Sequence, residues 1–380
     1  MKQEQLKREK PDYWLILVTF LLLGFGLVMV FSASYYKGLL DYHDSYYFIK
    51  KQLAFGLVGL VLFFIISNIH YSIYKKWVGF LLILSILLLI LVLILGDETN
   101  GAKRWLEFQS VSFQPSEFVK LTMIIYTASI MVKKQPVIHQ FKRAIAPPLV
   151  VIGIICSLLV LEPHFSATVI ILFTSLVIIF CAGARLKHLF LLFLSGVPVL
   201  LVTLYMSDYR VKRLVTVFNP FSDPQGSGYQ TIYSLYAIGP GGITGAGLGN
   251  SIQKMAYLPE AHNDFIFSIV AEELGFIGGA SLICLFIIFI IRGIRISLQA
   301  PDQFGTLLGI GIVTLLGVET IFNLGVVTAL LPVTGISLPF ISYGGTSLVL
   351  KLMAMGILLN ISRYRKVKST KTKQVRAIQT

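Results

Sequence analysis

The chain has 380 residues, of which 56% are hydrophobic and only 13% are charged, and its formal net charge is +14. A soluble globular domain carries roughly a quarter charged residues, so this composition excludes that class of protein. Long apolar runs recur along the sequence, and each can cross the ~30 Å hydrocarbon core of a bilayer as a helix. A transmembrane β-barrel is excluded, because its strands are about 10 residues long and alternate apolar and polar side chains.

Hydropathy predicts an all-α polytopic fold with ten transmembrane helices. In chain order, the predicted spans are residues 13–34, 49–67, 77–96, 117–132, 144–161, 166–182, 188–207, 264–291, 305–331 and 342–361. The first run is longer than the apolar part of a signal peptide and many spans follow it, so we expect no cleavage near Ser34. The expected organisation is a segment 1–12, a membrane domain 13–361 and a basic tail 362–380.

Lysine and arginine determine the expected orientation. With the N-terminus in the cytoplasm, 21 of the 32 basic residues face inward, so both termini are predicted to be cytoplasmic. The positive charge is then a topology signal and an attraction to anionic membrane lipids, and it does not indicate nucleic-acid binding. Cys156, Cys181 and Cys284 lie in apolar spans and suggest neither a disulfide nor a metal site.

Two outer loops are long, namely residues 97–116 and the large loop 208–263. The large loop is rich in Gly, Pro and aromatic residues, so we expect it to be ordered against the membrane surface. Both loops carry basic residues: Lys103 and Arg104 in the first, and Arg210, Lys212, Arg213 and Lys254 in the second. Two interpretations stay open for these side chains, namely anchoring at lipid headgroups and binding of an anionic group such as phosphate.

Several carboxylates stand at the outer ends of apolar runs. Glu117 opens a span in QPSEFVK and shares a helix face with Lys120, so the two can pair. Asp264 lies where the large loop becomes a helix, and a favourable helix dipole would explain it. The same position suits a general base, because partial desolvation raises the pKa of a carboxyl group. Ionisable residues in membrane segments are functional candidates.

Glu272 and Glu273 lie about 12–14 Å further along the helix than Asp264. We expect them to pair with polar groups of other spans, with Lys351 as one candidate. The glycine-rich segment 237–250 lies outside the cell and follows no strand, so its glycines are expected to form tight turns, not a nucleotide site. Pro339, Gly344 and Gly345 predict a broken or re-entrant segment before the last span.

Seven motifs, taken together, resemble the SEDS family (shape, elongation, division and sporulation), which includes FtsW, RodA and SpoVE. They are GAKRW (101–105), QPSEFVK (114–120), GSGYQ (226–230), SLYAIGPGG (234–242), LPEAHNDFIF (258–267), EELGF (272–276) and LPFISYGGTSL (338–348). The resemblance runs from the first span nearly to the end of the tenth, and VMVFSAS near the first span is closer to the FtsW and SpoVE branch.

The resemblance implies a peptidoglycan glycosyltransferase in the bacterial cytoplasmic membrane. Such proteins polymerise lipid II at the outer face, for cell division or a related cell-wall process. They work with a class B penicillin-binding protein and with other divisome or elongation proteins. A divalent cation, Mg²⁺ or Mn²⁺, that bridges pyrophosphate and acids is compatible with this reaction, although the sequence suggests no ligand set and no nucleotide site.

The family's motifs also imply roles for individual residues. The essential aspartate falls on Asp264, the acid and lysine of the QPSE motif fall on Glu117 and Lys120, and the basic pair falls on Lys103 and Arg104. Asp264 is the expected base for the attacking sugar hydroxyl, and Lys103, Arg104 or Arg210 would neutralise the departing pyrophosphate. Glu260 and His262, which flank Asp264, complete the candidate substrate-binding residues.

One motif departs from the family pattern, and two other functions compete with the enzyme. Many members have an aspartate after the proline that follows the fifth span, whereas EPHFSAT has His164 there and Glu162 before the proline. A scaffold that recruits and activates a penicillin-binding protein would tolerate loss of Asp264. A lipid II flippase would need polar residues reaching both faces, but charge concentrates outside, with Glu319 as the main exception. The enzyme ranks first, the scaffold second and the flippase third.

Overall fold

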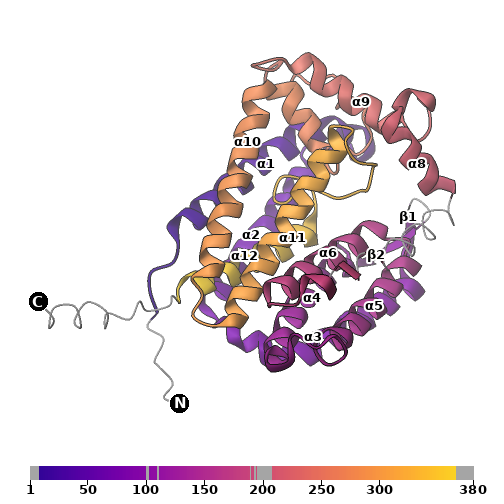
Figure 1. Cartoon of the computed structure of the whole chain (residues 1–380). Helices are drawn as coiled ribbons and strands as arrows, with labels where there is room; N and C mark the ends of the chain where they lie inside the picture. The colour runs from indigo at the N-terminus through magenta and orange to yellow at the C-terminus, as the bar shows by residue number, and fades with distance from the viewer. Residues whose placement is uncertain are drawn as a thin grey trace, which may run out of the picture.

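The structure, a computed structural model, describes residues 8–99, 102–108, 111–188, 190–191, 194 and 208–364. Its helices, labelled in Figure 1, are α1 (Tyr13–Tyr42), α2 (Tyr47–Asn68), α3 (Tyr74–Leu95), α4 (Pro115–Lys133), α5 (Ala146–Leu161), α6 (Phe165–Cys181), α8 (Asp208–Phe218), α9 (Tyr229–Ile238), α10 (Ile266–Leu298), α11 (Gln303–Val327) and α12 (Gly345–Ser362). Short 3-10 or π-helical turns lie at Tyr71–Ile73, Gln135–Val137, Phe141–Ile145, Pro220–Ser222 and Gly239–Gly241.

Each predicted span except 188–207 overlaps one helix, whereas α8 and α9 lie in the segment 208–263 that was predicted as a loop. In the described part of the chain, seven helices are long and apolar enough to cross a membrane, namely α1, α2, α3, α5, α10, α11 and α12, with α3 and α5 counted together with the turns before them. α6 is apolar but shorter, and α4 carries the charges of Glu117 and Lys120. The predicted span 188–207 lies almost entirely outside the described residues. A mostly helical, polytopic fold is therefore confirmed.

The loop after α3 is not purely irregular, and it contains the small sheet that the all-α prediction did not include. It forms a three-stranded antiparallel sheet in the order β1 (Asp97–Thr99), β2 (Ala102–Phe108) and β3 (Val111–Phe113). Leu106 on β2 is opposite Phe113 and is buried. A hydropathy window of about 19 residues averages over strands this short, which is why the sheet is missed.

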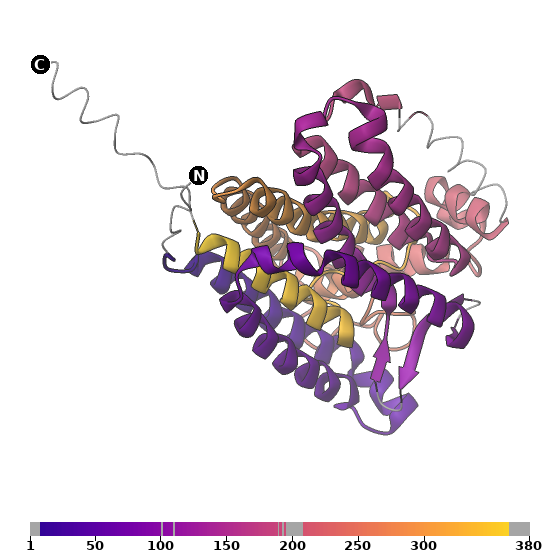
Figure 2. The same cartoon turned by 90° about the horizontal axis from the view of Figure 1, so that it is seen from below.

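The helices form two groups that meet at α11. α1, α2, α10 and α12 pack together on one side, and α3, α4, α5 and α6 lie on the other (Figure 1). Both views show α12 beside α2 (Figure 1, Figure 2). A Cβ at Gly356 would lie 2.7 Å from the carbonyl oxygen of Phe63, so only glycine allows this approach. In a membrane the hydrophobic effect does not drive helices together, so small residues that allow close backbone packing stabilise their association.

The two ends of the described chain meet at the end of the bundle away from α8 and α9 (Figure 1). The Asp12 carboxylate accepts from Leu15 N at 2.9 Å and so caps α1, while Asp12 N donates to Ser362 Oγ at 3.1 Å. Glu9 N donates to the carbonyl oxygen of Arg363 at 2.8 Å. The start of the first helix and the end of the last are therefore joined directly.

The large loop 208–263 is ordered and docks onto a break in α10. Gly275 has φ 63° and ψ −159°, which ends the first segment of α10. The loop supplies the hydrogen bonds that this break removes, because Phe276 N donates to Gly242 O at 2.9 Å and Gly247 N donates to Glu273 O at 2.9 Å. The glycine-rich segment thus forms turns and makes close backbone contacts, as predicted.

The carboxylates of Glu272 and Glu273 hold the same loop, and their predicted pairing with Lys351 is wrong. Glu272 accepts from Ser251 Oγ at 2.5 Å and from Ile252 N at 2.8 Å. Glu273 accepts from Lys254 Nζ at 2.6 Å, and both side chains are fully buried.

Glu273 also accepts from Ser32 Oγ of α1 at 2.7 Å, so one of its partners does come from another span. The open interpretations of Lys254, headgroup anchoring or anion binding, are excluded by its burial and its ion pair. Lys254 and Glu273 join the outer loop to α1 and α10.

Candidate active site

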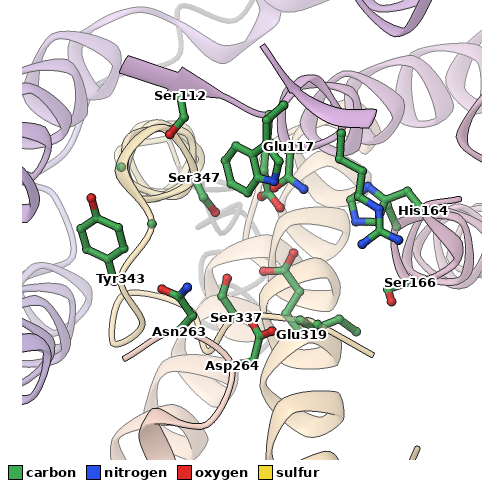
Figure 3. Close-up of a pocket in the computed structure, with 18 of the residues that line it drawn as sticks. Ser112, Glu117, His164, Ser166, Asn263, Asp264, Glu319, Ser337, Tyr343 and Ser347 are labelled. Atoms are coloured by element: carbon green, nitrogen blue, oxygen red, sulfur yellow. The ribbon is translucent and has the colours of Figure 1, made fainter. Parts of the chain in front are cut away.

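A cavity of about 410 Å³ opens where the small sheet meets the two helix groups (Figure 3). Its wall comes from β2, β3, the first turns of α4 and α6, α11, the segment before α10, and the segment between α11 and α12. That last segment, residues 328–344, is irregular, which agrees with the predicted break before the last span. The volume lies in the range typical of small-molecule sites.

Asp264 lies at the cavity wall, two residues before α10 begins, which agrees with its predicted position where the large loop becomes a helix. Neighbouring segments fix its backbone. Asn323 Nδ2 of α11 donates to the Asp264 carbonyl oxygen at 2.7 Å, and Ser342 Oγ donates to Asn263 O at 2.6 Å. Tyr343 N donates to His262 O at 2.9 Å. The Asp264 carboxylate is thus presented to the cavity by a rigidly held backbone.

The electrostatic surroundings of Asp264 suit a base. Burial raises the pKa of its carboxyl group to about 7, the Glu260 carboxylate acts in the same direction, and nearby cations oppose the shift. A carboxylate is an efficient general base when its pKa lies near the working pH, because it is then both deprotonated and basic enough to accept a proton.

A buried network of alternating charges forms another part of the cavity wall. Lys120 Nζ lies 2.7 Å from Glu117 Oε1, which confirms the predicted pair, and it also contacts Glu319 Oε1 of α11. Lys351 of α12 lies 3.5 Å from Glu319 Oε2 and donates to Ser337 Oγ at 3.2 Å. The four charges cancel, and removing one of them would leave an uncompensated buried charge.

Arg104 and His164 form a basic corner of the cavity, where β2 meets the turn between α5 and α6. The buried Glu162 of the same turn does not line the cavity but is close enough to interact electrostatically with Arg104. Arg104 donates through Nη2 to the carbonyl oxygen of Pro163. In the part of the chain that the structure describes, the two carboxylate oxygens of Glu162 have no hydrogen-bond partner, and the Nδ1 of His164 has none either. Burial raises the pKa of Glu162 to about 8, and burial with the nearby cations lowers the pKa of His164 to about 3.

Five of the residues predicted from sequence meet at this cavity. They are Arg104, Glu117, Lys120, Glu260 and Asp264. Motifs separated by more than a hundred residues in the sequence therefore converge on one cavity, as expected for an active site built at the ends of several helices.

Three other candidates are placed differently. Lys103 is half-buried on β2 and is not part of the cavity wall. His262 is buried behind the wall, with its ring 4.6 Å from that of Phe48 and 5.7 Å from that of Tyr343. Arg210 belongs to α8, and its side chain lies outside the described residues.

The cavity wall also contains polar residues that sequence reasoning did not select, including Asn263, Ser337, Tyr343 and Ser347 (Figure 3). Ser337 and Tyr343 lie in the segment whose glycines and proline predicted irregular backbone, so that signal could have identified them. Glu319 was noted only as an exception within its span. Its role as the partner of Lys120 and Lys351 requires knowledge of how α4, α11 and α12 pack.

Oxygen donors at the cavity determine whether a divalent cation fits there. Within the described residues, no group of three or more His, Cys, Asp or Glu side chains stands together, so the chain alone offers no cation cage there. The Asn263 Oδ1 is buried without a hydrogen-bond partner among the described residues, and the Glu260 carboxylate accepts from Asn263 Nδ2. Glu260 and Asn263 are therefore the candidate oxygen donors for one side of a hydrated Mg²⁺ or Mn²⁺.

Comparison with known proteins finds full-length relatives. Stage V sporulation protein E of Bacillus subtilis is 44% identical, covering 94% of this chain and 98% of its own length. A probable peptidoglycan glycosyltransferase FtsW of Trichlorobacter lovleyi is 42% identical, covering 92% of this chain and 93% of its own.

Solved structures share the fold. A chain from a peptidoglycan synthase complex superposes with a TM-score of 0.77 at 27% identity, covering 93% of this chain and 98% of its own. The rod shape determining protein RodA of Thermus thermophilus superposes with a TM-score of 0.70 at 27% identity, covering 94% and 98%. The model of the family described as "Cell cycle protein", FtsW, RodA and SpoVE, matches residues 13–367. The chain therefore belongs to this cell cycle protein family, and the resemblance of its motifs to the SEDS proteins is confirmed.

Proposed function

We propose that this chain is a peptidoglycan glycosyltransferase that polymerises lipid II into glycan strands at the outer face of the bacterial cytoplasmic membrane. The activity is that named for its FtsW relative. The observation that carries the proposal is the position of Asp264, whose carboxyl group lies at the wall of a polar cavity with its pKa raised to about 7. The cavity lies in a multi-pass membrane protein, where a lipid-linked sugar can reach it.

The proposed step uses the chain's own residues. Asp264 removes the proton of the 4-hydroxyl of the incoming sugar while that oxygen forms a bond to the anomeric carbon of the growing chain. The bond from the anomeric carbon to the lipid pyrophosphate breaks, and the pyrophosphate leaves with the electron pair. Arg104 at the cavity counters the developing charge, and Lys103 and Arg210 are further candidates for this role. Glu117, Lys120, Glu260 and His262 would shape and support the substrate-binding surface.

We also propose that a divalent cation, Mg²⁺ or Mn²⁺, enters with the pyrophosphate, and that no nucleotide is used. Glu260 and the Asn263 amide oxygen are the protein groups that would face it. The cation would neutralise part of the pyrophosphate charge. We propose no step of the reaction that depends on it.

The finer topology follows from hydropathy and charge. We propose ten spans with both termini cytoplasmic, the large loop 208–263 outside, and a cytoplasmic segment and basic tail flanking the membrane domain 13–361. The meeting of Glu9 with Arg363 supports termini on the same side. The docking of the loop onto the outer segment of α10 supports one compact membrane domain.

The proposed partner is a class B penicillin-binding protein, the transpeptidase that cross-links new strands. The structural similarity to a chain of a peptidoglycan synthase complex supports a partner of this kind. Other divisome or elongation proteins and anionic membrane lipids would contact the basic inner face.

The test compares lipid II polymerisation by wild type and Asp264→Asn, each purified with its penicillin-binding protein. Asp41→Asn is the matched control, because it removes an exposed carboxylate that does not line the cavity. Glycan strands from wild type and Asp41→Asn, but none from a folded and partner-bound Asp264→Asn, are expected. Strands from Asp264→Asn would remove this residue from the mechanism. No strands from wild type would favour a scaffold or a flippase, which a lipid II translocation assay would separate.

A further inference from the structure

His164 is a buried cavity residue that the proposed step leaves without a role. It is 8% exposed and lies on the α6 side of the cavity, with Ser166 beside it and Asp264 on another wall (Figure 3). Neither ring nitrogen hydrogen-bonds within the described residues, and only Nδ1 is fully enclosed. A buried polar side chain without a protein partner calls for a ligand or water to complete it.

The ring nitrogens can be assigned from this geometry. A buried N–H without an acceptor costs more than a buried lone pair, so in the neutral ring the proton is assigned to Nε2, the nitrogen with access to the cavity. His164 then offers the cavity a neutral N–H donor. An aspartate at the same position would offer only acceptors and a negative charge.

The groups around His164 make this corner attractive to an anion. Arg104 donates to the Pro163 carbonyl oxygen next to the ring, and its guanidinium remains charged at any physiological pH. Two carboxylates lie near this corner. Glu162 is 1% exposed, and its pKa of about 8 keeps it largely protonated at neutral pH. Glu117, which interacts electrostatically with His164, is paired with Lys120. Lys120 is already neutralised by Glu117 and Glu319. The corner therefore combines a permanent cation with a neutral donor.

We propose that His164 and Arg104 together bind the phosphoryl oxygens of a diphosphate ester at the corner between β2 and α6. This inference rests on the proposed function and adds an orientation to it. The leaving group of the glycosyl donor lies at the corner, and the acceptor hydroxyl lies at Asp264 on the other wall. His164 is then a specificity residue for the diphosphate, and it takes no part in proton transfer.

The test measures binding of farnesyl pyrophosphate, a short isoprenyl diphosphate, to the full-length protein in detergent by calorimetry. His164→Asp is expected to weaken binding at least about tenfold, because it replaces a donor by an anion beside the phosphates. His164→Gln keeps a neutral N–H donor and is expected to stay within about threefold of wild type. His188→Asp is the matched control, because His188 also has a buried Nδ1 without a partner among the described residues but lies away from the cavity.

Thermal unfolding of each variant checks that it is folded, and Arg104→Gln provides a second variant that should also weaken binding. The inference is overturned if His164→Asp binds the probe as wild type does, or if farnesol binds as tightly as farnesyl pyrophosphate. If wild type binds the probe in a His164-dependent way but makes no glycan strands, the glycosyltransferase proposal fails and the diphosphate site remains. If glycan strands form but binding of the probe does not depend on His164, only this inference fails.

Discussion

Asp264 shows how placement gives an ordinary carboxylate its chemistry. Its backbone is fixed by Asn323 and Ser342, and its side chain lies at a cavity where water is scarce enough to raise its pKa to about 7. Sequence reasoning found this residue because the end of a loop and the start of an apolar helix are visible in one short segment. It did not find Glu319 or His164 as cavity residues, because the elements that form the cavity around them are distant in the chain.

The raised pKa predicts a pH dependence for glycan synthesis. The base works when deprotonated, so the rate should rise with pH through about 7 and fall as protonation of Asp264 proceeds below it. Initial rates of strand formation between about pH 5.5 and 8.5 would test this, with thermal unfolding measured at each pH to separate activity from stability. An ordinary exposed aspartate would keep the rate flat down to about pH 5, and that outcome would contradict the assignment.

At the scale of elements, the helices were predictable and their interruptions were not. A helix in a bilayer must satisfy its own backbone and must be long, so hydropathy alone identifies it. The break at Gly275 is stabilised by hydrogen bonds to Gly242 and Gly247 of the large loop. The sequence near Gly275 does not indicate these distant partners. The small sheet β1–β3 similarly depends on pairing between strands. The burial of Lys254 depends on its ion pair with Glu273.

The break in α10 predicts a strong effect of Gly275→Ala. The φ of 63° and ψ of −159° are favourable only for glycine, and a Cβ there would lie 2.4 Å from Gly245 N. The variant should lose about 1–3 kcal/mol of stability from backbone strain, and more if the outer loop is displaced. Because Asp264 precedes the same segment of α10, glycan synthesis should fall as well.

Thermal unfolding in detergent measures this loss, and Gly24→Ala in α1 is the control, since a Cβ at Gly24 meets no atom within 4 Å. Equal melting temperatures for the two variants would show that the break tolerates a side chain.

At the scale of the whole molecule, the proposed topology makes opposite predictions for two exposed residues. Ser222 lies in the large outer loop and Gln299 lies at the far end of α10. In a chain whose three native cysteines are replaced, Ser222→Cys should react with a membrane-impermeant maleimide in intact cells whose outer barriers admit it. Gln299→Cys should react only after permeabilisation. Labelling of Gln299→Cys in intact cells would show that the bundle has the opposite orientation to the one proposed.

The junction between the two ends of the bundle also bears on how the protein is made. Asn360 of α12 donates to the carbonyl oxygen of Ser67 at 2.9 Å and accepts from Tyr71 N at 2.9 Å, while Ser362 accepts from Asp12 N. α12 is synthesised long after α1 and α2, and it therefore supplies partners to segments that were inserted earlier. Until α12 is inserted, the α2 surface that packs against Gly356 faces lipid or the insertion machinery. A ribosome that stalls before α12 would leave a membrane-inserted chain in which the α12-binding surface of α2 is exposed. Such a chain is a natural substrate for membrane quality control.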